Sequence, residues 1–308
     1  MGFRKSTRRD HLNVSEAFTS YERVRHRLPA ATSGGSCKRL PNLDALADEV
    51  DVFLLDAFGV LNIGDTAIGG VPERVARLQK VGKRVIIVSN AAGFPHADLI
   101  EKYKRLGYDF APEDVITSRK ATLQALENAP SLKWGLMATE SLGRGDIEPF
   151  DMTYLAENAA AYDQAEAFVL FGSAAWNETR QALLEASLRE HPRPVYVGNP
   201  DIVAPRESGF SVEPGHYAHR LADQSGVVLQ FFGKPFGNIF ELAFTQIDDF
   251  DRARILMVGD SLHTDILGGQ AAGLKTALIA DYGFFSGHDV DGPIATSGIQ
   301  PDYILQRP

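Results

Sequence analysis

The sequence has little of several features that would place it in a special class. Its 308 residues include one cysteine, Cys37, so no intrachain disulfide can form, which fits a reducing cytoplasm. No apolar run approaches the length of a membrane span, and the basic start lacks the apolar segment of a secretory signal. No internal repeat of fixed period is present. We therefore expect a cytoplasmic protein with no membrane contact.

Basic residues are outnumbered by acidic ones, with 31 Lys and Arg against 40 Asp and Glu. The formal net charge is −9, which argues against nucleic acid or an anionic membrane as a partner. The basic run formed by Arg4, Lys5, Arg8 and Arg9 is expected to be a solvated tail. What the sequence does contain is 44% hydrophobic residues over a length too great for one typical core, which favours two globular domains.

Short apolar strands and amphipathic helices alternate along much of the chain. Val52–Leu55, Val85–Val88 and Ile255–Val258 are continuous apolar runs, typical of strands buried on both faces. Val227–Phe232 is predicted to be a further strand of this series. Alternation of this kind implies parallel βαβ units, so we predict an α/β fold with a doubly wound parallel sheet.

The middle of the chain has strands and a helix of its own. They are predicted at Trp134–Thr139, Ala167–Phe171, Val195–Val197 and, for the helix, Glu178–Glu190. We therefore expect an inserted α/β domain over residues 119–230. A core of residues 39–118 and 231–308 and an N-terminal extension of residues 1–38, with a helix within Val14–Arg27, complete the predicted organisation.

Polar residues follow the predicted core strands. Asp56 ends the first, Ser89 and Asn90 end the second, and Asp260 follows the third, with Lys234 between the last two. Because ligands bind at the carboxyl ends of the strands in an open parallel sheet, we expect these residues to form one site.

These residue types suit phosphoryl transfer. A carboxylate such as Asp56 can attack phosphorus and form an aspartyl-phosphate. Asp56 and Asp260 together can hold Mg²⁺, a hard cation that prefers oxygen ligands. Lys234 can neutralise phosphoryl oxygens, and the Ser89 hydroxyl can donate to them. Asp265 can fix Lys234 or a metal-bound water.

Four segments, in order along the chain, resemble the motifs of the haloacid dehalogenase (HAD) superfamily. They are Asp56-Ala57-Phe58-Gly59-Val60, Ser89, Lys234-Pro235 and Gly259-Asp260 to Asp265. Further segments are similar to class IIA members of the NagD and 4-nitrophenylphosphatase types. These are Gly259–Gly269 with Ala272-Gly273-Leu274, Gly233-Lys234-Pro235, Asn199-Pro200-Asp201 and Pro214-Gly215.

The resemblance implies a Rossmann-like core with a class IIA cap, because only the interval from Ser89 to Lys234 is long enough to hold a domain. It also implies a Mg²⁺-dependent hydrolase, a phosphatase of a small phosphorylated metabolite, and a homodimer formed through the cap as one expected assembly. The implied catalytic residues are Asp56, Lys234 and Ser89. The implied substrate-binding residues are Ser89, Asn90, Lys234 and Asp201. The implied metal ligands are Asp56, the backbone carbonyl of Phe58 and Asp260, with Asp265 in support.

One position departs from the first motif. Its second aspartate, a general acid and base in the family, is Phe58 here. An alcohol leaves a phosphate ester as a basic alkoxide, and proton donation to it is typically worth about 10²–10⁴-fold. The candidates for a substitute acid are His263, Asp65, His216 and His219.

Three functions stay open because of Phe58. The first, which we predict, is a phosphatase whose acid comes from elsewhere or whose substrate has an acidic leaving group. The second is a dehalogenase, since 2-haloacid dehalogenases carry an aromatic residue at this position and halide leaves without a proton. The place of the cap and the fourth motif count against it. The third is a protein that binds a phosphorylated ligand with little turnover.

Overall fold

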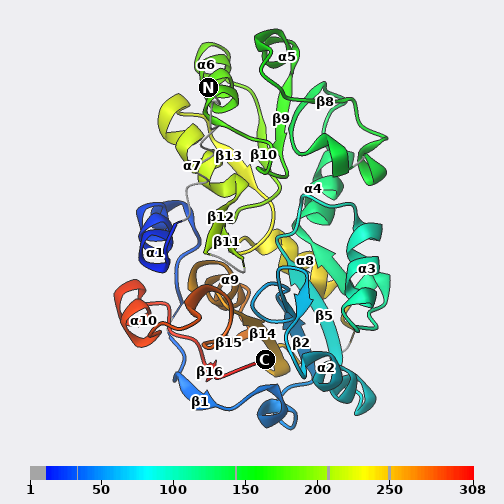
Figure 1. Ribbon diagram of the computed structural model, residues 1–308, viewed down its shortest axis with the longest axis vertical. Coiled ribbons are helices and arrows are strands. Elements are labelled where there is room, and N and C mark those ends of the chain that lie inside the picture. The colour runs from blue at the N-terminus through cyan, green and yellow to red at the C-terminus, as the bar shows by residue number, and fades with distance from the viewer. Residues whose placement is uncertain (1–11, 33, 143, 207–208, 249–250) are drawn as a thin grey trace, which may run out of the picture.

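The computed structural model describes residues 12–32, 34–142, 144–206, 209–248 and 251–308, which form two stacked α/β units (Figure 1). The basic run at residues 4–9 lies outside the described residues. Among the described residues, every helix is too short or too polar to cross a membrane.

The larger unit is built on a parallel sheet of seven strands. Their order from one edge to the other is β1 (Lys38–Leu40), β16 (Tyr303–Leu305), β15 (Lys275–Ile279), β14 (Ile255–Gly259), β2 (Val52–Leu55), β5 (Arg84–Ser89) and β6 (Val115–Thr117). The central strands β2 and β14 are buried throughout, as their apolar sequences predicted. In their register Leu55 is paired with Val258, so the residues that follow both strands emerge at the same edge.

Helices cover both faces of this sheet, because successive side chains of a strand point to opposite faces. Phe53 and Leu55 pack in one hydrophobic cluster with residues of α2 and α3, whereas Val52 and Leu54 pack in another with residues of α8. The helices of this unit are α2 (Val71–Lys80), α3 (His96–Arg105), α4 (Ser118–Glu127), α8 (Gly237–Phe244), α9 (Leu267–Ala271) and α10 (Asp291–Ser297). The predicted doubly wound parallel fold is confirmed.

The second unit is inserted between α4 and α8 and has a parallel sheet of five strands. Their order is β13 (Leu229–Phe231), β10 (Val195–Val197), β9 (Ala167–Leu170), β7 (Trp134–Met137) and β8 (Met152–Tyr154). Three helices belong to it, α5 (Ala159–Gln164), α6 (Glu178–Glu190) and α7 (Pro214–Ser225). Two antiparallel hairpins lie outside both sheets: β3 (Asn62–Ile63) with β4 (Thr66–Ala67), and β11 (Val203–Pro205) with β12 (Phe210–Val212).

The strand predicted at Val227–Phe232 does not continue the core sheet. It forms β13, which pairs with β10 at the edge of the inserted sheet. In the core sheet, β14 pairs with β2 on one side and with β15 on the other, so the strand that precedes it in sequence cannot pair with it there. The apolar sequence suggested a strand buried in the core, but Val228 is 88% exposed.

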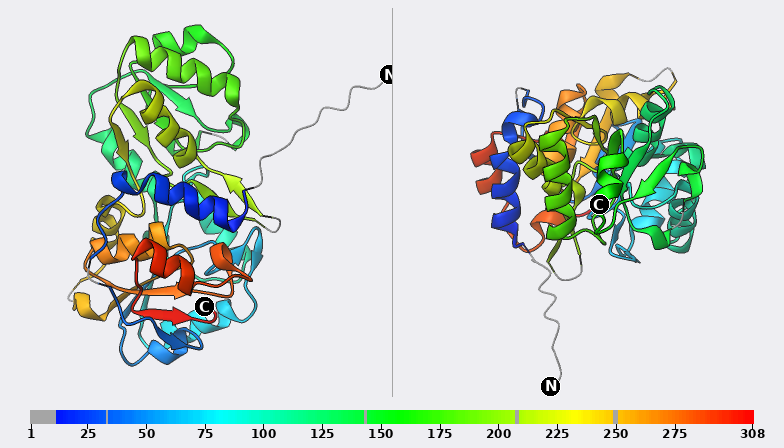
Figure 2. Two further views of the ribbon diagram at one scale, coloured as in Figure 1. Left: turned by 90° about the vertical axis from the view of Figure 1, so that its left-hand side faces the viewer. Right: turned by 90° about the horizontal axis from the view of Figure 1, so that it is seen from above.

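The N-terminal extension contains α1 (Val14–Arg23), followed by a 3₁₀ turn at Arg25–Arg27. Its start is fixed by a capping box, in which Asn13 and Glu16 each accept the other's backbone N–H. Ala17 and Tyr21 are its buried residues. Figure 2, in its left view, shows α1 lying across the junction of the two units.

Candidate active site

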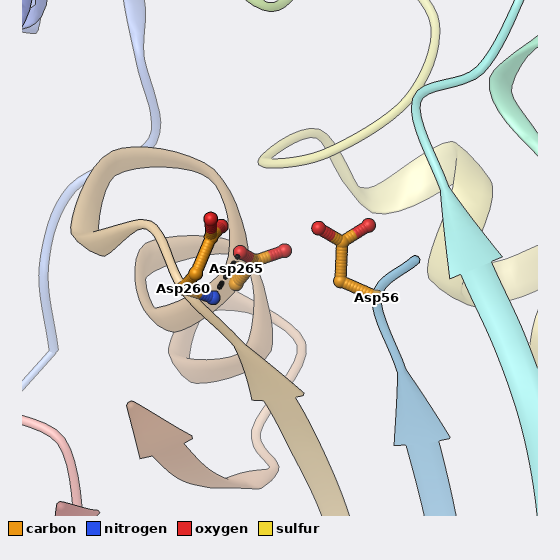
Figure 3. Close-up of side chains that lie close together, drawn as sticks. All are labelled: Asp56, Asp260 and Asp265. Atoms are coloured by element: carbon orange, nitrogen blue, oxygen red, sulfur yellow. Dashed lines mark hydrogen bonds between the residues drawn. The ribbon is translucent and has the colours of Figure 1, made fainter. Parts of the chain in front are cut away.

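Three carboxylates meet at the carboxyl edge of the core sheet (Figure 3). Asp56 directly follows β2, Asp260 directly follows β14, and Asp265 lies in the π-helical turn Leu262–Ile266 that precedes α9. One carboxylate oxygen from each lies within 4.8 Å of the other two. The parallel register of β2 and β14 therefore brings together residues that are far apart in sequence.

Both oxygens of Asp265 are already engaged. Oδ2 accepts hydrogen bonds from the backbone N–H groups of Asp260 and Ser261, each at 3.1 Å. Oδ1 lies 2.7 Å from Lys234 Nζ. Asp265 therefore contacts both the start of the turn and the lysine.

Two glycines leave room for the Asp260 side chain. Both Gly59, with φ of 75°, and Gly283, with φ of 72°, have left-handed backbones that favour glycine. A Cβ on Gly59 would lie 2.3 Å from Asp260 Oδ2, and one on Gly283 would lie 1.9 Å from it. The same oxygen accepts the backbone N–H of Phe284 at 2.8 Å. Gly59 belongs to the first motif, whereas Gly283 lies outside all four motifs and was not predicted.

Lys234 is buried and held at both ends. Its Nζ donates to Asp56 Oδ1 at 2.5 Å, in addition to its ion pair with Asp265. Its backbone N–H donates to Asn90 Oδ1 at 2.8 Å, and its carbonyl accepts from Asn90 Nδ2 at 2.9 Å. Burial disfavours the charged amine, but Asp265 and Asp56 outweigh it and raise the pKa of Lys234. The lysine therefore carries its positive charge beside Asp56.

The electrostatics of the carboxylates fit a cation. Burial, countered by Lys234 and reinforced by Asp265, raises the pKa of Asp56 to about 6. Burial also raises the pKa of Asp260, followed by repulsion from Asp265 and Asp56. One lysine thus faces three carboxylates, and oxygen ligands of this kind suit a hard divalent ion. The residues present therefore fit the metal that the resemblance implies.

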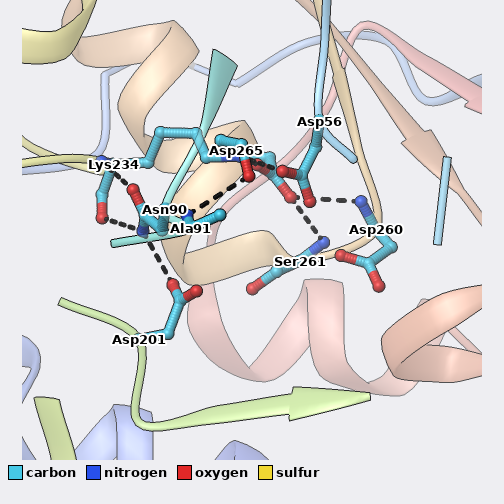
Figure 4. Close-up of polar contacts among 9 residues, drawn as sticks. Asp56, Asn90, Ala91, Asp201, Lys234, Asp260, Ser261 and Asp265 are labelled. Atoms are coloured by element: carbon cyan, nitrogen blue, oxygen red, sulfur yellow. Dashed lines mark hydrogen bonds and ion pairs between the residues drawn. The ribbon is translucent and has the colours of Figure 1, made fainter. Parts of the chain in front are cut away.

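Asp201, which precedes the β11–β12 hairpin, reaches this group through Asn90 (Figure 4). Asn90 Nδ2 donates to Asp201 Oδ1 at 2.7 Å. Burial raises the pKa of Asp201 to about 8, against the opposing effects of the Asn90 hydrogen bond and Lys234. Ser89 is buried at the end of β5, where its Oγ accepts the Ala91 N–H at 3.3 Å. The predicted site residues therefore lie around one edge of the sheet.

Phe58 has two cations beside its ring. Lys102 Nζ, from α3, and the guanidinium carbon of Arg206, which follows β11, each lie 5.2 Å from the ring centroid. Asp65, a candidate acid, forms an ion pair with Lys102 at 2.9 Å, and its side chain is 94% exposed. Hydrogen bonding to Lys102 lowers the pKa of Asp65, so it is a poor proton donor near neutral pH.

The three histidine candidates for a substitute acid each contact neighbouring side chains. His263 is buried, and its Nε2 lies 2.5 Å from Glu22 Oε1. The physical reason is that α1 covers it. His219 is buried in α7 and stacks on Phe231, and burial lowers its pKa to about 4. His216 makes an edge contact with Tyr217.

This fold and site define a hydrolase of the HAD type. The family model for haloacid dehalogenase-like hydrolases matches residues 53–143, and a second HAD-hydrolase-like model matches residues 231–307. The chain is 31% identical over 307 residues to glycerol-3-phosphate phosphatase of Gallus gallus, covering 90% of this chain and 96% of that protein. The chain therefore belongs to the haloacid dehalogenase-like hydrolase family and is an enzyme of its phosphatase branch.

Two further similarities fit this assignment. The chain is 28% identical to the chloroplastic phosphoglycolate phosphatase 1A of Arabidopsis thaliana, covering 88% of this chain and 78% of that protein. A crystal structure of a possible sugar phosphatase from Cytophaga hutchinsonii has the same fold, with a TM-score of 0.74 and 24% identity, over 88% of this chain and 98% of that one. The inserted unit is the class IIA cap of this family.

Proposed function

We propose that the protein is a Mg²⁺-dependent phosphatase that hydrolyses a phosphate monoester of a small metabolite through an aspartyl-phosphate on Asp56. The observation that carries this proposal is the environment of the Asp56 carboxylate. It lies 2.5 Å from Lys234 Nζ and within 4.8 Å of the Asp260 and Asp265 oxygens. A carboxylate can attack an anionic phosphate only where cations offset the repulsion between them.

The proposed reaction has two displacements. Asp56 attacks phosphorus, the ester P–O bond breaks, and the leaving group departs with the electron pair. Water then attacks the aspartyl-phosphate, which releases inorganic phosphate and restores the Asp56 carboxylate. Lys234, Ser89 and Asn90 bind the phosphoryl oxygens in this proposal, and Asp265 keeps the Lys234 amine in place.

Asp56, Asp260 and the backbone carbonyl of Phe58 are the proposed ligands of Mg²⁺. When bound, the ion neutralises charge on the phosphoryl group and orients it. The choice of Asp260 rather than Asp265 is supported by the hydrogen bonds that already occupy Asp265. Asp260 accepts the Phe284 N–H with Oδ2, and no hydrogen bond from the described residues reaches its Oδ1.

The inserted unit begins after α4 and its last strand ends at Phe231, so its bounds differ from the predicted 119–230. We further propose that this unit closes over the site and excludes water, with Asp201 contacting the substrate. The hydrogen bond between Asp201 and Asn90 supports this role, because it already joins the cap side to the phosphate side. Dimerisation through the cap and a cytoplasmic location stay predictions. The insertion of the cap after β6, rather than between the first two motifs, disfavours the dehalogenase function.

The test is hydrolysis of 4-nitrophenyl phosphate with Mg²⁺ and with excess chelator. We expect activity only with metal, and no activity in Asp56→Asn. Asp51→Asn is the matched control, because Asp51 precedes the same strand at its opposite end and pairs with Arg254 and Lys83. Equal rates with chelator would remove the metal from the proposal. Tight binding of phosphate without turnover would instead establish the binding protein.

A further inference from the structure

The helix α1 touches the cap side of the active site through a tyrosine. Tyr21 is 2% exposed, and its hydroxyl oxygen accepts the backbone N–H of Ile202 at 3.1 Å. Ile202 directly follows Asp201, whose carboxylate accepts from Asn90. One hydroxyl on α1 is therefore a single residue away from the link between cap and core.

The same helix encloses a histidine of the fourth-motif turn. The His263 ring stacks on Tyr21, with centroids 5.1 Å apart and planes at 10°, and meets the edge of Phe18 at 5.2 Å. Its Nε2 lies 2.5 Å from Glu22 Oε1. His263 stands between Asp260 and Asp265 in the chain, so α1 contacts the segment that carries both carboxylates.

Apolar packing joins these two contacts into one cluster. Residues of α1, of the hairpin segment and of the core share it: Ala17, Tyr21, Val24, Ile202, Val203, Phe210, Leu262, Ile266 and Phe284. Beyond the helix, Arg27 forms an ion pair with Asp223 of the cap helix α7. The N-terminal segment is thus anchored on the core, on the hairpin segment and on the cap (Figure 2).

We propose that α1 is a strap that positions the active site, with Tyr21 as its positioning residue. By holding Ile202, Tyr21 keeps the Asp201 carboxylate in reach of Asn90 while the cap moves. Closure of a cap completes the binding site, and small misplacements of binding groups reduce rates strongly. The kinetic part of this inference rests on the proposed function, whereas the structural part does not.

Tyr21→Phe tests the strap, because it keeps the ring and deletes the hydroxyl that accepts the Ile202 N–H. We expect the Ile202 amide to exchange with solvent about tenfold faster. We also expect KM for phosphate esters to rise about 5- to 30-fold, the effect of losing one such contact, while kcat changes by less than about threefold. Tyr162→Phe is the control, since its hydroxyl bonds the Ala156 carbonyl at 3.0 Å inside the cap. Its KM should be unchanged.

Arg27→Ala is a second variant that removes the anchor on α7 without touching the buried cluster. Its ion pair is partly exposed, so the protein should fold, and KM should rise by only about two- to fivefold. Unchanged KM in both variants, with a lower Tm, would reduce α1 to a stabilising element and overturn the proposal. If the wild type has no phosphatase activity, the proposed function fails. In that case unaltered exchange at Ile202 in Tyr21→Phe would separately overturn the strap.

Discussion

The guanidinium carbon of Arg206 lies 5.2 Å from the centre of the Phe58 ring, and this contact connects the β11–β12 hairpin with the loop that follows β2. Lys102 lies at the same distance from the ring. Two cations therefore border the position at which the first motif of the family carries its acid. Both cations can stabilise the negative charge of a departing group.

The first prediction concerns the leaving group. Without an acid at position 58, an alkoxide must depart with its full charge, whereas a nitrophenolate leaves unaided. We expect kcat to fall steeply from aryl to alkyl phosphates, and aspartyl-phosphate to accumulate with aryl substrates. Measuring kcat across a series of esters with graded leaving-group pKa tests this. A flat dependence in the wild type would reveal a substitute acid.

Restoring a carboxyl group completes that test. Phe58→Asp should raise turnover of alkyl esters, by up to about 10²–10⁴-fold. Lys102 and Arg206 would lower the pKa of the new carboxyl, so we expect the gain to lie at the lower end. Phe58→Asn is the control, because asparagine is similar in size to aspartate but cannot act as a general acid. Its turnover of alkyl esters should not rise.

The second prediction concerns Lys234, which is buried between Asp56 and Asp265. Lys234→Ala should weaken binding of phosphate or a metal-fluoride analogue about 10- to 100-fold, because a charge-assisted hydrogen bond is lost. It should also lower stability by about 3–5 kcal/mol, because two buried carboxylates lose their cation. Calorimetric titration and urea unfolding measure the two effects. Lys83→Ala is the control, and unchanged affinity in Lys234→Ala would refute the phosphate-binding assignment.

The third prediction concerns metal and stability. Mg²⁺ at 100 times its Kd should stabilise the wild type by about 2.7 kcal/mol. Asp260→Asn should lose most of this gain, yet be more stable than the wild type in chelator, because repulsion from Asp56 and Asp265 is removed. Thermal unfolding with and without Mg²⁺ measures both. Asp65→Asn, an exposed carboxylate, should behave like the wild type. An equal Mg²⁺ effect in Asp260→Asn would place the ion elsewhere.

The fourth prediction is a pH dependence caused by Asp201. Its pKa is about 8 in the folded protein and 3.8 ordinarily, so between these values the folded state holds a proton that the unfolded chain releases. The free energy of unfolding should therefore fall as pH rises from about 4 to about 8. Asp201→Asn should flatten this fall, while its amide oxygen still accepts from Asn90. Urea unfolding in chelator at pH 5 and 8 measures it.

Asp51→Asn is the control for the pH experiment. Hydrogen bonds from Arg254 and Lys83 lower the pKa of Asp51, so its carboxylate is ionised in both states at pH 5 and at pH 8. Replacing Asp51 with asparagine should therefore lower the free energy of unfolding by the same amount at both pH values. A pH slope in Asp201→Asn equal to that of the wild type would contradict the assignment to Asp201.

The sequence was most informative where a single physical pattern decides the structure. Continuous apolar runs predicted the buried central strands β2 and β14, because a strand covered on both faces needs no polar side chain. Parallel strands then require their carboxyl ends to converge, so Asp56 and Asp260 could be expected to meet. The place of the cap followed from the one interval long enough to hold it.

Other features depended on contacts between distant segments and left no local signal. The largely apolar sequence of Val227–Phe232 suited either sheet, and only the pairing of β13 with β10 decides between them. His263 occupies a first helical turn that would be exposed in isolation, and α1 buries it from more than 200 residues away. Gly283 is needed because the Asp260 side chain comes close, which no periodicity in its own loop could indicate.

The last strand of the cap, β13, ends at Phe231, and Lys234 follows only three positions later with its main chain bonded to Asn90. The amine that faces Asp56 is thus mounted on the connection through which the cap returns to the core. If the closed cap binds phosphate more tightly than the open cap, a ligand that favours the closed cap tightens phosphate binding, and phosphate tightens the binding of that ligand by the same factor. Inorganic phosphate, the product, would in this way bias the cap against its own release.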